Sequence, residues 1–112
     1  MKKRNWITIF VILAVIILAV IIMNKQNPIA EEDVAKCIGE NSELYIQLGC
    51  HACETQEEMF GNNYQYLNTI DCFFERELCI EKGIEATPTW IINEEIYKGV
   101  QSIDKLKELT KC

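Results

Sequence analysis

The sequence predicts an α/β domain, a mixed sheet flanked by helices, preceded by one transmembrane helix. Three observations lead to this prediction. A long uncharged apolar stretch opens the chain. Short helix-like and strand-like segments then alternate through the remainder. The last two strand-like segments are joined by a turn and followed by a helix, so the sheet should mix parallel and antiparallel pairs.

The apolar stretch at residues 6–23 has the length of a membrane span. It contains no charged residue, and its eighteen residues would form about 27 Å of helix, close to the ~30 Å hydrocarbon core. Lys2, Lys3 and Arg4 precede it, so residues 1–5 should be cytoplasmic and the rest outside the cytoplasm, in a single-pass protein of the cell membrane. The alternative is a cleaved signal peptide, which has a shorter apolar region and small residues at its cleavage site.

The charge of the remaining chain is strongly acidic. Residues 24–112 carry eight Lys and Arg against seventeen Asp and Glu, a net charge of −9. This balance argues against nucleic acid as a partner, because binding to phosphates needs basic side chains. All six cysteines also lie in this part, and an even number on the oxidising side of a membrane fits disulfides in a small domain.

The elements follow in order after a linker at residues 24–27. Asn27 is expected to cap a first helix, with Pro28 at its first position and Gly39 as its stop. The domain therefore takes residues 28–112. Further segments are expected as strands at 44–48, 66–72, 89–93 and 96–100, and as helices at 50–60, 75–82 and from Ser102 through Lys111.

The motif Cys50-His51-Ala52-Cys53 is the sharpest chemical signal. Residues three apart on a helix lie side by side, so the two sulfurs can form a bond. Cys50 would stand at the helix N-terminus, where free N–H groups and the positive dipole end stabilise the attacking thiolate. His51 is a candidate for tuning the pair when protonated, or it is a solvent-facing residue without a role.

Two other interpretations of this cysteine pair remain open. It could be a permanent structural disulfide of an exported domain. It could also be half of a zinc site completed by Cys72 and Cys79, although that second pair is too widely spaced for the usual zinc knuckle. Redox catalysis is the interpretation that the position after a strand favours, and no metal or other cofactor is expected.

The segment Thr87-Pro88-Thr89-Trp90 gives a second signal. A proline that enters a strand sits at its first residue or on an edge, and here it follows a loop. It stands some 35 residues after the cysteine motif, directly before the apolar strand at 89–93. Such a proline is a candidate for a cis peptide bond in a tight turn.

From about Val34 to Cys112 the chain resembles the thioredoxin superfamily. It is similar in particular to the thioredoxin-like domain of bacterial and archaeal vitamin K epoxide reductase homologues, and more distantly to DsbA-type oxidases. The ordered set of segments that carries the resemblance is Val34–Cys37, Cys50–Cys53, Glu57–Gly61, Ile70–Cys72, Leu78-Cys79, Gly83-Ile84, Thr87–Trp90 and Gly99–Ser102. The fold that the resemblance implies is thioredoxin-like.

The resemblance also implies roles for individual residues. Cys50 would be the exposed nucleophile and Cys53 the buried resolving thiol, while Pro88 would be cis and face the pair. The backbone around Thr87 would bind a substrate strand. Relatives usually have Trp before the first cysteine and Pro after it, whereas Gly49 and His51 stand here. The redox potential therefore does not carry over.

The four remaining cysteines allow three pairings. We favour Cys72–Cys79, which would close a short loop. We also favour, less strongly, Cys37–Cys112, which would tie the first helix to the chain end. For each pair the alternative is two free buried thiols that behave as small apolar residues.

The sequence thus predicts a membrane-anchored extracytoplasmic thiol–disulfide oxidoreductase. It would pass disulfides to the thiols of exported proteins and be recharged by a quinone-linked membrane oxidase of the vitamin K epoxide reductase or DsbB type, as the resemblance suggests. The alternatives are an extracytoplasmic thiol reductase, for example in cytochrome maturation, and a non-catalytic metal-binding or structural module.

Overall fold

The N-terminal helix α1, Lys2–Met23, contains the predicted membrane span. The structure is a computed structural model that describes residues 2–24 and 29–112. None of the side chains of α1 is buried, and by length and composition the helix is able to cross a membrane. Most of the predicted linker at 24–27, together with Pro28, lies outside the described residues.

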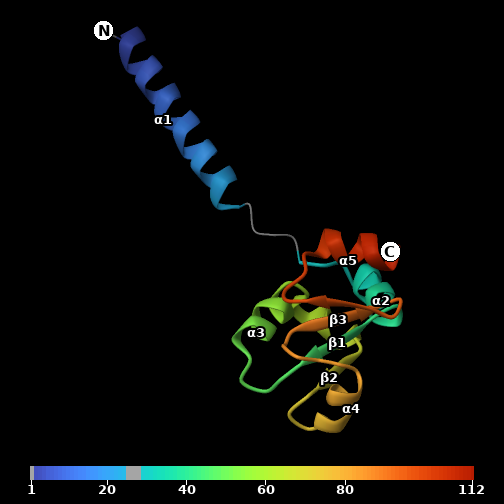
Figure 1. Ribbon diagram of the computed structural model, residues 1–112. Coiled ribbons are helices and arrows are strands. Elements are labelled where there is room, and N and C mark those ends of the chain that lie inside the picture. The colour runs from blue at the N-terminus through green and yellow to red at the C-terminus, as the bar shows by residue number, and fades with distance from the viewer. Residues whose placement is uncertain (1, 25–28) are drawn as a thin grey trace.

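A four-stranded sheet forms the centre of the C-terminal part (Figure 1). Its strands are β1 (Glu43–Ile46), β2 (Thr69–Asp71), β3 (Thr89–Ile92) and β4 (Glu95–Lys98), in the order β2-β1-β3-β4. The pair of β1 with β2 is parallel, whereas β1 with β3 and β3 with β4 are antiparallel. The predicted mixed sheet and the closing hairpin are therefore confirmed.

Helices surround this sheet, and they are α2 (Glu32–Glu40), α3 (His51–Glu58), α4 (Arg76–Glu81) and α5 (Ile103–Thr110), with a 3-10 helix η1 (Gly61–Tyr66). The core lies between one face of the sheet and the helices α2, α5 and η1. Leu44 of β1 and Trp90 of β3 are paired neighbours on that face, and Ile38 of α2 and Leu106 of α5 pack in the same cluster. The rings of Phe60 and Trp90 are 6.2 Å apart between centroids, so the end of α3 rests on β3.

The expected start and stop of the first helix were wrong. Asn27 and Pro28 lie outside the described residues, and Ile29 and Ala30 are not helical. The helix begins after Glu31, whose backbone is extended, and it continues through Gly39 to Glu40. A Cβ on Gly39 would overlap the backbone oxygen of Tyr66. Gly39 therefore permits the close approach of α2 to η1 rather than ending the helix.

The second predicted strand, 66–72, and the helix at 50–60 were both too long. The strand shrinks to the three residues of β2, and α3 ends at Glu58. Between them the chain forms η1, which no sequence pattern predicted. Asn63 Nδ2 donates to the Ala30 carbonyl at 2.9 Å, and Ala30 N donates to Met59 O at 3.1 Å. The second bond satisfies the Met59 carbonyl, which a longer helix would have bonded internally, and both bonds tie the segment before α2 to this region.

Candidate redox site

Cys50 occupies the first turn of α3 because the chain reverses sharply after β1. Gly49 has a φ of +83°, a conformation that glycine adopts without strain and that a side chain such as Trp would resist. Cys50 is then the N-cap of α3, with its own N–H donating to the Gln47 carbonyl at 3.0 Å. The turn before Cys50 thus depends on glycine at position 49 for its backbone conformation.

The sulfur of Cys50 serves as the cap of the helix. It accepts a hydrogen bond from Cys53 N at 3.1 Å, the role that an oxygen of Ser or Asp plays at other N-caps. A helix N-terminus carries free N–H groups and a partial positive charge. Both features favour negative charge on this sulfur, which is the form in which it attacks or leaves.

Cys50 and Cys53 are joined by a disulfide, with their Cα atoms 5.2 Å apart. Their exposure differs: Cys53 is buried, at 7% exposed, whereas Cys50 is half-buried. An incoming thiolate therefore meets the sulfur of Cys50 first. The geometry makes Cys50 the accessible member of the pair and Cys53 the protected one.

The loop before β3 faces this sulfur. Thr87–Pro88 is a cis peptide bond, and the Thr87 carbonyl oxygen lies 3.5 Å from Cys50 Sγ. Pro88 is fully buried, and its carbonyl accepts from Gly99 N at 2.8 Å. The cysteine motif and the proline motif therefore meet at one end of the sheet, although Cys50 and Thr87 are 37 residues apart in sequence.

The remaining titratable groups near the pair lie in solvent. His51 is 96% exposed at its side chain, and its Nδ1 is 3.5 Å from a carboxylate oxygen of Glu54. In the loop that leads to Thr87, Glu85 forms an ion pair with Lys98 of β4 at 2.7 Å. The hydrogen bond from Lys98 lowers the pKa of the Glu85 carboxyl. This pair ties the proline loop to the hairpin.

The other four cysteines form two further disulfides, Cys37–Cys112 and Cys72–Cys79. These are the two pairings that the spacing favoured. The first joins α2 to Cys112, two residues beyond the end of α5, across 75 positions, and the second links cysteines seven positions apart. Within residues 2–24 and 29–112, no three His, Cys, Asp or Glu side chains gather in a way that would hold a metal ion.

Gln56 is a component of the site that the sequence did not predict. It is fully buried on α3, where its Oε1 accepts from Trp90 Nε1 at 3.0 Å and from Gln101 N at 2.8 Å. Its Nε2 donates to the Gln101 carbonyl at 3.0 Å. These bonds fix the helix that carries the cysteines to the strand that follows Pro88. A polar residue on an otherwise buried helix face was the only signal available in the sequence.

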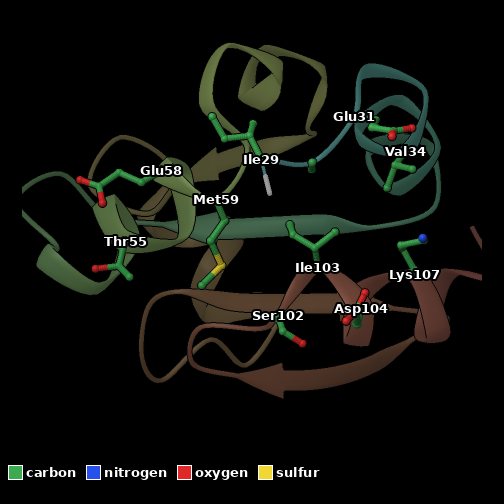
Figure 2. Close-up of a pocket in the computed structure, with 11 residues that line it drawn as sticks. Ile29, Glu31, Val34, Thr55, Glu58, Met59, Ser102, Ile103, Asp104 and Lys107 are labelled. Atoms are coloured by element: carbon green, nitrogen blue, oxygen red, sulfur yellow. The ribbon is translucent and has the colours of Figure 1, made fainter. Parts of the chain in front are cut away.

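A groove of about 720 Å³ lies near the opposite end of α3 (Figure 2). Thr55, Glu58 and Met59 line it from α3 and the residue after it, with Ile103 and Lys107 of α5 on another side. Neither Cys50 nor Pro88 borders it. The groove is therefore separate from the cysteine pair, whose Cys50 is half-buried at the other end of the helix.

Comparison with known proteins shows similarity to a thiol–disulfide oxidoreductase. No family model matches the sequence. The chain is 32% identical over 78 residues to the thiol–disulfide oxidoreductase LTO1 of Arabidopsis thaliana. The matched segment covers 62% of this chain and 21% of the Arabidopsis protein. The chain thus corresponds to about a fifth of this relative.

Two solved structures resemble this chain at lower sequence identity. The AhpF component of the Enterococcus faecalis alkylhydroperoxide reductase is 22% identical, with 76% of this chain and 46% of that chain covered and a TM-score of 0.49. The oxidised thioredoxin of Plasmodium falciparum is 16% identical, with 75% and 92% covered and a TM-score of 0.44. The sheet order, the paired cysteines that open α3 and the adjoining proline loop identify the chain as a protein of thioredoxin-like fold, similar in sequence to a thiol–disulfide oxidoreductase.

Proposed function

We propose that this protein is a membrane-anchored, extracytoplasmic thiol–disulfide oxidoreductase that passes its Cys50–Cys53 disulfide to exported proteins. The observation that carries the proposal is the placement of a half-exposed disulfide sulfur at a helix N-terminus, 3.5 Å from the carbonyl of the proline loop. The printed name of the similar Arabidopsis protein supports the same reaction class.

The reaction is a pair of disulfide exchanges. A substrate thiolate attacks Cys50 Sγ, the Cys50–Cys53 bond breaks, and Cys53 leaves as a thiolate that takes up a proton. A second substrate thiolate then attacks the substrate sulfur of the mixed disulfide and releases Cys50. Two electrons pass from the substrate dithiol to the cysteine pair, and the substrate gains one disulfide.

The features around the pair each support one step. The N–H of Cys53 and the positive end of α3 stabilise Cys50 as a leaving thiolate in the second exchange. Burial of Cys53 keeps competing thiols away from it. The backbone at the half-buried Thr87 would bind the extended substrate segment by β-augmentation, which presents the attacking sulfur to Cys50.

The proposal also assigns the protein a location in the membrane and its reduced cysteine pair an oxidant. Helix α1 would anchor the chain in the cell membrane, and Lys2, Lys3 and Arg4 favour a cytoplasmic N-terminus. The reduced pair must return its two electrons to an oxidant. We assign this role to a quinone-linked membrane thiol oxidase of the vitamin K epoxide reductase or DsbB type, which a membrane anchor would keep within reach.

Trapping of mixed disulfides tests the proposal. In Cys53→Ala the Cys50 thiolate attacks the disulfide of an oxidised substrate, the reverse of the second exchange, and one substrate sulfur leaves as a thiolate. Because the resolving thiol is missing, the mixed disulfides at Cys50 should accumulate and appear as adducts on non-reducing gels. Cys50→Ala with Cys53 intact is the matched control and should give none. An absence of exported proteins among the adducts would contradict the proposed role.

The direction of transfer needs a separate measurement. Acid quenching followed by alkylation records the in-cell state of Cys50 and Cys53. We expect a mainly oxidised pair, which becomes reduced when quinone reoxidation is blocked. A mainly reduced pair under normal growth would identify a thiol reductase instead.

A further inference from the structure

The groove at the far end of α3 has an apolar centre. Figure 2 shows Ile29, Met59 and Ile103 around this centre, and Val34 of α2 also lines the groove. Ile29 is 58% exposed, whereas Val34, Met59 and Ile103 are half-buried. Its volume of about 720 Å³ lies in the range of binding sites, and an apolar hollow that remains in solvent marks a surface for interaction.

The rim of the groove is acidic. Glu31, Glu58 and Asp104 line it with one basic residue, Lys107, so three negative charges and one positive charge leave a net charge of −2. Within residues 2–24 and 29–112, none of the three carboxylates forms an ion pair. Carboxylates without a cationic partner beside an apolar surface are suited to bind a Lys or Arg of another molecule.

The groove is held close to the membrane span by the length of the chain. Ile29 follows Met23, the last residue of α1, by six positions. An extended chain covers at most about 3.5 Å per residue, so Ile29 lies within about 21 Å of the end of the span. With α1 across the membrane, as proposed above, proteins embedded in the same membrane meet the groove at a high effective concentration.

The charge of the rim favours a membrane protein over the lipid surface as the occupant. Anionic lipid headgroups attract basic segments and repel carboxylates such as those at the rim. A protein segment that carries a Lys or Arg between apolar side chains would match both the centre and the rim. The function proposed above requires one membrane protein as a partner, the thiol oxidase that accepts electrons from the reduced pair.

The groove and the redox site lie at opposite ends of one helix. Nine positions separate Cys50 from Met59, about 14 Å at the rise of an α-helix. Ala30 N donates to the Met59 carbonyl at 3.1 Å, which fixes the segment after the span to this end of α3. A protein seated in the groove would therefore reach Cys50 with a neighbouring loop, whereas a substrate bound at Thr87 would not need the groove.

We propose that this groove is the docking site for an extracytoplasmic segment of the membrane thiol oxidase, with a Lys or Arg flanked by apolar side chains. The inference rests on the function proposed above and names the surface that holds this partner. The Cys50 thiolate attacks the oxidase disulfide, and one oxidase sulfur leaves as a thiolate. The Cys53 thiolate then attacks Cys50 Sγ, which forms the Cys50–Cys53 bond and releases the second oxidase sulfur. Two electrons pass to the oxidase and from there to its quinone.

Charge reversal at the rim tests the inference. Glu58→Lys with Asp104→Lys is compared with Glu77→Lys and Glu81→Lys, an equal charge change on α4 away from the groove. The cells that make the protein are treated with dithiothreitol and washed, and acid quenching with alkylation follows reoxidation of the cysteine pair. We expect reoxidation to be about tenfold slower in the groove variant and unchanged in the control.

A second variant removes an apolar contact without a change of charge. Ile29→Ser should slow reoxidation about fivefold, while Ile80→Ser, which replaces a 66% exposed side chain of α4, should not. Each full chain, purified in lipid nanodiscs and oxidised, should still oxidise a reduced, unfolded protein within about twofold of the wild-type rate. Glu58 lies about 12 Å from Cys50 along α3, beyond a Debye length of ~8 Å, so its charge is screened from the reacting sulfur.

The outcomes separate the groove from the proposed function. If the purified wild-type chain oxidises no protein, or its pair is mainly reduced in cells, the proposed function fails. If the wild-type pair is oxidised in cells and the groove variants reoxidise equally fast, the function stands and the inference about the groove is wrong. Lipid as the occupant would give this second result, because added Lys strengthens binding to anionic headgroups. A matching loss of the purified transfer rate would also overturn the inference.

Discussion

The Cys50–Cys53 and Cys72–Cys79 disulfides both join a short helix to the loop before it, yet their surroundings differ. Cys50 is the N-cap of α3 and accepts from Cys53 N, so one sulfur lies at a positive helix end and beside the proline loop. Cys79 is buried within α4, and Cys72 precedes that helix by four residues. In the proposed function, location relative to a helix terminus is what separates the transferable disulfide from the structural one.

Cysteine substitutions should show the largest difference between the two disulfides, in the rate of disulfide transfer. Cys50→Ser removes the attacked sulfur, so we expect disulfide transfer to fall by more than about a thousandfold. The double variant Cys72→Ser with Cys79→Ser keeps the reacting sulfur and should retain transfer within about tenfold. Oxidation of a reduced, unfolded protein measures both. Comparable losses in the two variants would contradict the division of roles.

Stability should change in the opposite order. Removal of Cys37–Cys112, which closes 75 positions, should lower the free energy of unfolding by about 4 kcal/mol, and removal of Cys72–Cys79 by about 2 kcal/mol, in the chain-entropy account. Reduction of Cys50–Cys53, which closes only three, should cost less. Denaturant unfolding of the alanine double variants provides the values. Equal costs for the long and short loops would count against this account.

The link between α3 and β3 should respond to Gln56. Gln56→Met leaves Trp90 Nε1 and the Gln101 backbone without partners inside the core, and we expect a loss of about 2–3 kcal/mol of stability. Gln56→Glu keeps an acceptor for Trp90, so its stability should lie between that of the wild type and that of Gln56→Met. The rate of disulfide transfer should decrease with Met more than with Glu. A Met variant as stable as the wild type would refute the positioning role.

The ion pair behind the proline loop should give the smallest effect. Its carboxyl, Glu85, has a pKa below the ordinary value of 4.5. The stabilisation is therefore present above that value and is lost as the pH falls through the lower folded-state pKa. Glu85→Gln should lower the melting temperature slightly at pH 7 and leave it unchanged at an acidic pH below the folded-state pKa, where the carboxyl is protonated in both states. A difference that persists at the acidic pH would assign the effect to something other than this charge.

Local signals in the sequence predicted much of this arrangement. The cysteine spacing, the capping Ser102 and the order of helices and strands depend on neighbours within a few residues, and each appears in the structure. The features that were missed depend on distant partners. Gly39 is required by Tyr66, and Gln56 is required by Trp90 and Gln101. No local pattern reveals a contact across 34 or 45 positions.

The order in which the three disulfides are reduced tests the account most directly. The oxidised protein is equilibrated with buffers of decreasing potential, free thiols are alkylated, and mass spectrometry assigns each label. We predict that Cys50–Cys53 is reduced at the highest potential, while Cys37–Cys112 and Cys72–Cys79 resist to below about −300 mV, as structural disulfides do. Reduction of Cys72–Cys79 before Cys50–Cys53, or of all three together in a folded chain, would contradict the assignment of Cys50 and Cys53 as the redox pair.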